Sequence, residues 1–187
     1  YKDRYQMPKL IVNAAGDEFF LPTSSQFYFN ELPGEKYLRY VPNANHSLSG
    51  TDALETVLAF YASILNNIPR PVFSWDFNND GSITVTSKTE VKEVNMWSAN
   101  NDKARDFRKD IIGSSWRATN LSKNNDGSYK AKPETPTKGW KAYFIELTYE
   151  TPFGIPLKLT TPVRVTPDSL PYQRQPPKEP KKGFLTK

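Results

Sequence analysis

The chain has 187 residues and a net charge of +5, a length that suits one large domain or two small ones. Hydrophobic residues make up 37% and aromatic residues 13%, which is enough for a packed core and excludes an intrinsically disordered chain. The sequence has no cysteine, which excludes disulfides, thiolate zinc sites and a cysteine nucleophile, and it has no apolar run long enough for a membrane-spanning helix.

The first third of the chain reads as strand, helix, strand, helix. A continuous apolar run predicts a buried parallel strand over 9–15. Pro22 or the polar residues 23–25 can begin a helix that ends at 33–34, and a second strand is predicted over 36–42. This alternation is typical of an open α/β sheet.

The next segment predicts an amphipathic helix that begins at Thr51 or Asp52. Glu55 would complete a capping box if Asp52 is the N-cap residue. The apolar residues recur at helical spacing and share one face: Leu54, Val57, Leu58, Tyr61, Ile64 and Leu65. The prolines of residues 66–71 end this helix.

After residue 70 the apolar pattern changes to a period of two. Six or seven short strands at regular spacing predict a β-sandwich over 70–171. Two of its turns contain the sequence NNDGS, a hairpin signal. The first, within DFNNDGS, also resembles the start of a calcium loop, but Ser87 stands where that loop requires glutamate, so we favour a hairpin turn and predict no metal site.

Residues 172–187 form a tail rich in proline and lysine, with five basic residues and one acidic residue. We expect this tail to be poorly ordered. Its charge favours a solvated or membrane-surface segment over a nucleic-acid-binding face, which needs basic and aromatic residues interleaved on one surface.

Asp17 and the single histidine, His46, follow the two strands predicted in the first third. Functional groups in open α/β sheets collect beyond the carboxyl ends of the strands, so these two side chains are expected to be neighbours. A carboxylate can fix the histidine tautomer and leave the other ring nitrogen to accept a proton from a nucleophile. The spacing fits equally well a turn aspartate and a histidine at a helix start.

The chain contains no G-x-S-x-G pentapeptide, the strand-to-helix turn that carries the serine of an α/β-hydrolase. Ser24, Ser25, Ser47 and Ser49 are present, but none lies in such a turn. We therefore expect at most two members of a catalytic triad in this chain, and no cofactor.

Two further groups in the second half have simple structural interpretations. Trp75, Trp97, Trp116 and Trp140 could line a carbohydrate-binding face, but aromatic residues at strand positions more often fill a sandwich core. Residues 104–110, ARDFRKD, read as a surface cluster of ion pairs.

Several segments carry a resemblance to a known family: PKLIVNAAGDEFFLP, GEKYLRYVPNANHSL, VNMWSANNDKARDFR and GWKAYFIELTYETPFGIPLKLTTPVRVTPDSLP. They are similar to the carboxyl-terminal part of the PhoPQ-activated pathogenicity-related protein family, over residues 1 to about 171. The resemblance implies an α/β-hydrolase domain that ends at about residue 69, followed by an Ig-like β-sandwich extension over 70–171.

The resemblance also implies that Asp17 is the triad acid and His46 the triad base of a serine hydrolase for ester, peptide or other acyl bonds. The serine would belong to an upstream part of the hydrolase domain, on the same parent or a companion chain, which we expect as a partner. A protein or membrane-surface partner is a further expectation; nucleic acid is not. An extracytoplasmic location is implied. Because a related secreted eukaryotic member restrains proliferation, a non-catalytic binding or signalling role is the alternative.

Overall fold

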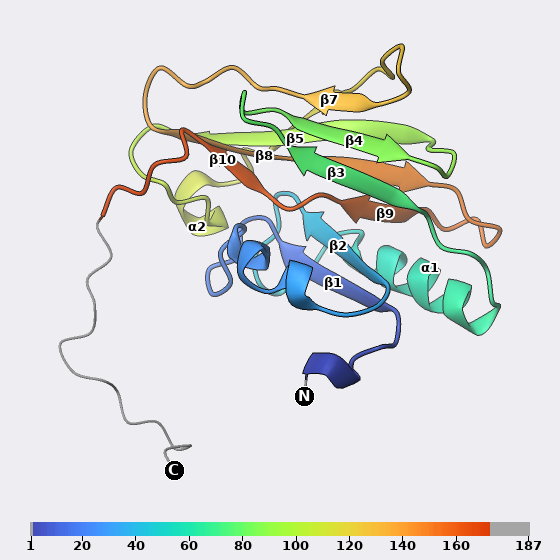
Figure 1. Ribbon diagram of the computed structural model, residues 1–187. Helices are drawn as coiled ribbons and strands as arrows, with labels where there is room; N and C mark the ends of the chain where they lie inside the picture. Colours follow the sequence, from blue (N-terminus) through green and yellow to red (C-terminus); the bar gives the residue numbers. More distant parts are fainter. Residues whose placement is uncertain (1, 173–187) are drawn as a thin grey trace.

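The computed structural model describes residues 2–172, so the proline- and lysine-rich tail predicted for 172–187 lies outside the described residues except for Tyr172 (Figure 1). This part of the chain has a mixed α/β fold that is mostly strand. It contains a seven-stranded mixed sheet, a three-stranded antiparallel sheet and two α-helices. Neither helix is long and apolar enough to cross a membrane.

The elements of residues 2–172 are ten strands, two α-helices and three short 3₁₀ helices. The strands are β1 (Lys9–Ala14), β2 (Lys36–Val41), β3 (Phe73–Phe77), β4 (Ile83–Ser87), β5 (Glu93–Asn101), β6 (Arg117–Asn120), β7 (Tyr129–Ala131), β8 (Trp140–Tyr149), β9 (Leu157–Thr160) and β10 (Arg164–Thr166). The helices are α1 (Ala53–Leu65), α2 (Lys109–Ile112), η1 (Lys2–Arg4), η2 (Ser24–Phe27) and η3 (Phe29–Glu31).

The two strands predicted in the first third are confirmed to within a residue, and they pair in parallel. Lys9 lies opposite Lys36 and Ala14 lies opposite Val41. Both strands therefore end at the same edge of the sheet, the edge at which α2 also lies (Figure 1). No described strand pairs with the outer edge of β1.

Strand β2 joins the first third of the chain to the rest. Its other edge pairs antiparallel with β9, where Leu38 lies opposite Thr160 and the Tyr40 amide donates to the Thr160 hydroxyl at 3.0 Å. The order of the large sheet is β1-β2-β9-β8-β5-β6, with β10 continuing beside β8 after β9. Strands from both sides of residue 70 thus share one continuous sheet.

Strands β3, β4 and β7 form the smaller sheet, which packs on one face of the larger one (Figure 1). Alternate residues of β8 serve the two faces. Ile145 meets Ile83 and Val85 of β4 in one core, whereas Phe144 faces a second core. That second core includes Ala15, Phe29, Phe107 and Trp116, so the loops that follow β1 and β5 rest on it. Side chains of β8 are buried on both faces, which explains its almost continuous apolar sequence.

The helix predicted between Pro22 and residue 34 is wrong. The segment contains two 3₁₀ helices, η2 and η3, separated by Tyr28. Tyr28 has φ −141° and ψ −27°, which is not a helical conformation, so it interrupts the helical hydrogen bonding. Burial of Phe29 in the second core then outweighs the local tendency of the segment to continue as one helix.

Helix α1 confirms the helix predicted from Thr51 or Asp52, but its capping box is wrong. Asp52 is the N-cap residue, yet its carboxylate makes no capping bond and instead pairs with Arg39 and Lys158, each at 2.7 Å. Ion pairs with the buried Arg39 and the partly buried Lys158 hold the carboxylate away from the helix amides, so the tertiary contact replaces the local one.

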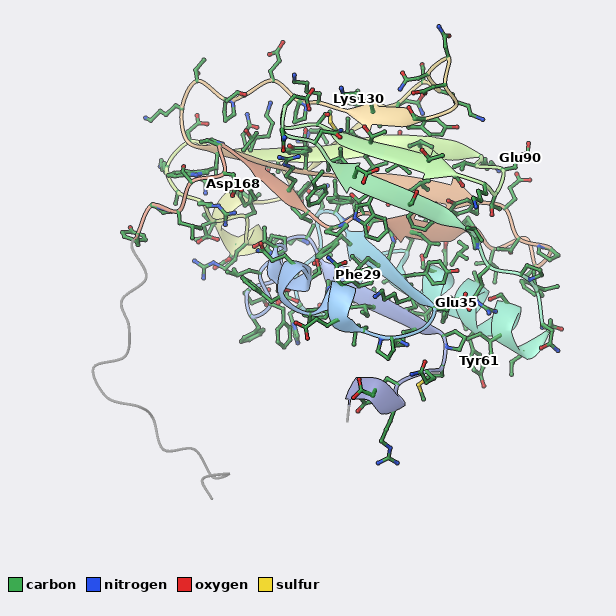
Figure 2. The ribbon with its side chains drawn as sticks, viewed as in Figure 1. Phe29, Glu35, Tyr61, Glu90, Lys130 and Asp168 are labelled. Carbon is green, nitrogen blue, oxygen red and sulfur yellow. The ribbon has the colours of Figure 1, made fainter. Side chains whose placement is uncertain are left out.

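The apolar face of α1 lies on the outside of the described structure. The helix packs on β1 and β9 through a face of mostly small residues: Ala53, Thr56, Ala59, Phe60 and Ser63. Leu54, Tyr61 and Leu65 are 66%, 57% and 63% exposed, and Val57 and Leu58 are also exposed. Tyr61 lies on the side of α1 away from the sheets (Figure 2). Helical apolar spacing normally marks the face toward a core, so α1 presents an uncovered apolar stripe.

Candidate active site

Asp17 and His46 are in contact, as the positions of their strands predict. Asp17 follows β1 by three residues and His46 follows β2 by five, and the parallel register brings these ends together. The Nδ1 atom of His46 lies 3.0 Å from Oδ2 and 3.2 Å from Oδ1 of Asp17. Both distances are within the range of an N–H···O hydrogen bond between an imidazole and a carboxylate.

The loop that follows β1 fixes the Asp17 carboxylate. Asp17 is 3% exposed, and its Oδ1 accepts hydrogen bonds from the amides of Phe19 at 2.8 Å and Phe20 at 2.9 Å. Burial raises the pKa of Asp17, but the two amides and His46 together outweigh it, so the pKa lies below its usual value. The side chain is therefore an oriented carboxylate at neutral pH.

Gly16 leaves no space for a side chain beside this carboxylate. A Cβ at this position would lie 2.8 Å from the carbonyl oxygen of Ala44 and 3.0 Å from the backbone nitrogen of Lys109. The Lys109 amide, at the start of α2, donates to the Gly16 carbonyl at 2.9 Å. The loops after β1, β2 and β5 therefore meet at Gly16, immediately before the acid.

His46 is held by both its backbone and its ring. Its amide donates to the Glu18 carboxylate at 3.1 Å, and its ring packs edge-on against Phe19, with 4.9 Å between centroids, and at a tilt against Phe20 at 5.6 Å. The side chain is 46% exposed. Because Nδ1 faces Asp17, Nε2 is the ring nitrogen left for a further partner, and no described residue hydrogen-bonds to it.

A buried group of charged residues supports the loop that carries His46. Arg39 and Glu146 are 1% and 3% exposed and form a hydrogen-bonded ion pair. Arg39 and Lys158 both bind Asp52, which precedes α1. Burial raises the pKa of Asp52, but the two cations outweigh it and the pKa is lowered. The group thereby ties strands β2, β8 and β9 to the end of the His46 loop.

Sequence reasoning missed this group, although its signal is present. Arg39 interrupts the apolar run KYLRYV and Glu146 interrupts FIELTY. An arginine or glutamate is almost never fully buried unless it is paired, so one charge of each sign in two buried strands was a sign of a contact between them.

Comparison with known proteins bears on this site. The model of the family described as "PhoPQ-activated pathogenicity-related protein" matches residues 1–108, more than half of the chain, and the match includes Asp17 and His46. The chain belongs to this family. It is also 34% identical over 199 residues to autocrine proliferation repressor protein A of Dictyostelium discoideum. That alignment covers 92% of this chain and 40% of the relative, so the chain spans less than half the length of that curated relative.

The serines of this PhoPQ-related chain do not complete a triad within residues 2–172. Ser47, next to His46 in sequence, donates its hydroxyl to Asn45 at 2.9 Å and accepts from the Ser49 amide. No described serine hydroxyl is hydrogen-bonded to the His46 ring. The predicted assignment of Asp17 as acid and His46 as base is compatible with this geometry and stays a prediction.

Both NNDGS segments of the family member are turns, but the hairpin interpretation is confirmed only for the first, because the second connects β6 of the large sheet to β7 of the small one and these strands do not pair. Asp80 accepts from the amide and the hydroxyl of Ser82, at 3.0 and 2.6 Å, and Asp126 accepts likewise from Ser128, at 2.9 and 2.7 Å. The first turn joins β3 to β4. Among the described residues, no group of three or more histidine, aspartate or glutamate side chains is arranged to hold a metal ion.

The tryptophans fill the cores only in part, and the charged segment 104–110 forms only part of the predicted ion-pair cluster. Trp116 is 1% exposed in the second core, and the other three tryptophans pack partly buried against one core or both. In the charged segment, Arg108 and Asp106 form an ion pair at 2.7 Å. Arg105, Lys109 and Asp110 form no ion pair with any described residue, so the predicted ion-pair cluster is reduced to this one pair.

Proposed function

We propose that this chain supplies the acid and the base of a serine hydrolase, and that an upstream part of the same α/β-hydrolase domain supplies the nucleophile. The observation that carries the proposal is the 3.0 Å contact of Asp17 with Nδ1 of a half-exposed His46, at the carboxyl ends of adjacent parallel strands. Both residues lie within the part of the chain, residues 1–108, that matches the PhoPQ-related family.

In this mechanism His46 Nε2 accepts the proton of the serine hydroxyl while the serine oxygen attacks an acyl carbonyl. The imidazolium is stabilised by Asp17, which remains ionised because its pKa is held low. His46 then gives its proton to the leaving group. Deacylation repeats the cycle with water as the nucleophile, so the substrate class is an ester, a peptide or another acyl bond.

The uncovered surfaces of β1 and α1 support the proposed domain arrangement. β1 has an outer edge that no described strand covers, and the adjacent α1 exposes Leu54, Leu58 and Tyr61. A parallel edge strand and an apolar helix stripe are what further strands and helices of a hydrolase sheet would cover. We therefore propose that residues 1–69 are the last part of that domain, that residues 70–171 are an Ig-like sandwich extension, and that the upstream part docks here.

Reaction with a serine-directed fluorophosphonate tests the hydrolase proposal on the full-length protein. We expect covalent labelling of a serine upstream of this chain, slowed by at least about 10³-fold in His46→Ala, because the serine loses its base. Ser49→Ala, in the same loop, is the matched control and should label at the wild-type rate. Labelling that is unchanged in His46→Ala would contradict the proposal.

The alternative is an extracytoplasmic binding or signalling protein that retains the Asp17–His46 pair without using it. The name of the Dictyostelium relative, a proliferation repressor, favours this alternative. A proliferation assay separates the two. The full-length protein and its variants His46→Ala and Asp17→Asn are each added to growing cells. If all three repress cell proliferation equally, a signalling role that does not need catalysis is supported. If both variants lose repression while remaining folded, the repression depends on the hydrolase chemistry. Export of the protein to the medium or periplasm tests the proposed location.

A further inference from the structure

A cleft of about 510 Å³ is lined in part by the loop that follows Asp17 and is not used by the proposed chemistry. Its walls include Leu21, which directly follows the two phenylalanines packed on the His46 ring. They also include segment 103–108, whose continuation at Lys109 is hydrogen-bonded to Gly16. Two separate segments of the cleft wall are thus fixed to the loop that holds the acid. Its volume is within the range of small-molecule sites.

Several residues that line the cleft are apolar and unusually exposed. Leu21, Leu170 and Tyr172 are 53%, 73% and 85% exposed, and Trp140 lies among them, held by a hydrogen bond from its indole Nε1 to the Ser169 carbonyl at 3.2 Å. Exposed apolar side chains that gather around a hollow mark a ligand or partner site more often than isolated ones do. These residues suit an alkyl or aryl group.

The cleft is also lined by three cationic side chains, Lys103, Arg105 and Arg108. Arg108 is neutralised by its ion pair with Asp106. Arg105 has no such partner: its Nε is buried without a hydrogen bond, and its guanidinium forms no ion pair in residues 2–172. Asp168 lines a smaller neighbouring hollow together with Arg105 but does not pair with it.

We propose that this cleft binds the acyl part of the substrate and that Arg105 recognises a free carboxylate on it. The planar guanidinium can bind a carboxylate with two parallel hydrogen bonds, while the apolar lining residues hold the body of the acyl group. The substrate class is therefore an ester or amide whose acyl chain carries a carboxylate. This inference rests on the proposed hydrolase function.

Binding of a matched pair of probes tests the cleft without any need for catalysis. We expect full-length protein to bind 4-phenylbutyrate at least about tenfold more tightly than the neutral isostere 4-phenylbutanamide, followed by calorimetry or by Trp140 fluorescence. Arg105→Gln should abolish the preference and Arg105→Lys should retain part of it. Arg4→Gln, an exposed arginine outside the cleft, is the control, and circular dichroism checks the fold of each variant.

Hydrolysis of paired esters separates this inference from the function on which it rests. p-Nitrophenyl glutarate should have a kcat/KM at least about tenfold above that of p-nitrophenyl valerate, and Arg105→Gln should remove the difference. Hydrolysis of both esters at equal rates would overturn the carboxylate site and leave the hydrolase standing. Carboxylate-selective binding without hydrolysis of either ester would support the carboxylate site and contradict the proposed hydrolase function. Equal binding of the two probes, no binding of either, or selectivity that survives Arg105→Gln would overturn the inference.

Discussion

Asn43 and Trp116 are joined by two reciprocal hydrogen bonds. The Asn43 side chain donates to the Trp116 carbonyl at 3.0 Å and accepts from the Trp116 amide at 2.9 Å. Asn43 lies three residues before His46 and has a φ of 56°, and the Trp116 ring is buried against Phe144, with 5.2 Å between ring centroids. The loop that carries the histidine is thereby attached to the residue that precedes β6, 73 residues away in sequence.

Replacement of Asn43 should separate the two contributions of this residue. We expect Asn43→Gly to lower the free energy of unfolding by about 2 kcal/mol, because both bonds to Trp116 are lost while the backbone conformation is retained. Asn43→Ala should lower it by roughly 1 kcal/mol more, since alanine is strained at a left-handed φ. Urea denaturation measures both. Equal stabilities of the alanine and glycine variants would contradict the role of the backbone.

The buried ion pair of Arg39 and Glu146 should be far more sensitive to the loss of one partner than to the loss of both. Arg39→Met leaves the Glu146 carboxylate buried and unpaired, and we expect a loss of about 3–5 kcal/mol in the free energy of unfolding. The double variant Arg39→Met/Glu146→Leu should recover most of that loss, because it leaves no buried charge unpaired between β2 and β8. A double variant that is no more stable than Arg39→Met would contradict this prediction and show that the fold requires the ion pair itself.

The lowered pKa of Asp17 predicts a pH-dependent contribution to stability. A carboxyl whose folded pKa is below its unfolded value stabilises the fold above the unfolded pKa of about 3.9 and loses that effect as the pH falls through the folded pKa. The difference in unfolding free energy between wild type and Asp17→Asn should therefore be largest at neutral pH and shrink below about pH 4. Glu90→Gln, at an exposed position, should show no comparable trend in the same urea titrations.

The apolar stripe of α1 predicts self-association of the isolated 187-residue chain. Sedimentation velocity at micromolar concentrations should detect dimers or larger species, because the exposed side chains of Leu54, Leu58 and Tyr61 can cover one another. Leu58→Glu should shift the chain toward monomer with little change in its melting temperature. Val72→Glu, an equally exposed apolar position away from α1, should not. A wild-type chain that remains monomeric would contradict this prediction.

The features that sequence reasoning found were those in which local chemistry decides the structure. The ends of two apolar runs located Asp17 and His46 at one edge of a parallel pair, because parallel strands must end together. Asn-Asp-Gly determined both turns, since glycine supplies the positive φ, 84° at both Gly81 and Gly127, and the aspartate accepts a hydrogen bond from the serine two residues later.

The features that it missed depend on segments far apart in the chain. No local pattern shows that β2 pairs antiparallel with β9, or that Asp52 prefers Arg39 and Lys158 to its own helix. The spacing of apolar residues predicted the apolar face of α1, but whether other segments cover that face depends on the rest of the molecule. Arg105 looked like its neighbour Arg108, and only the folded arrangement shows that one is paired and the other is not.

The central place of β2 has a consequence for how members of this family can exchange parts. Since β2 is hydrogen-bonded to β1 on one edge and to β9 on the other, the strand that leads to His46 is built on a surface contributed by the end of the chain. A hybrid of two relatives joined near residue 70 would have to match Leu38 and Tyr40 of one parent to Thr160 of the other. Recombination, natural or engineered, is therefore constrained to move these distant strands as a set.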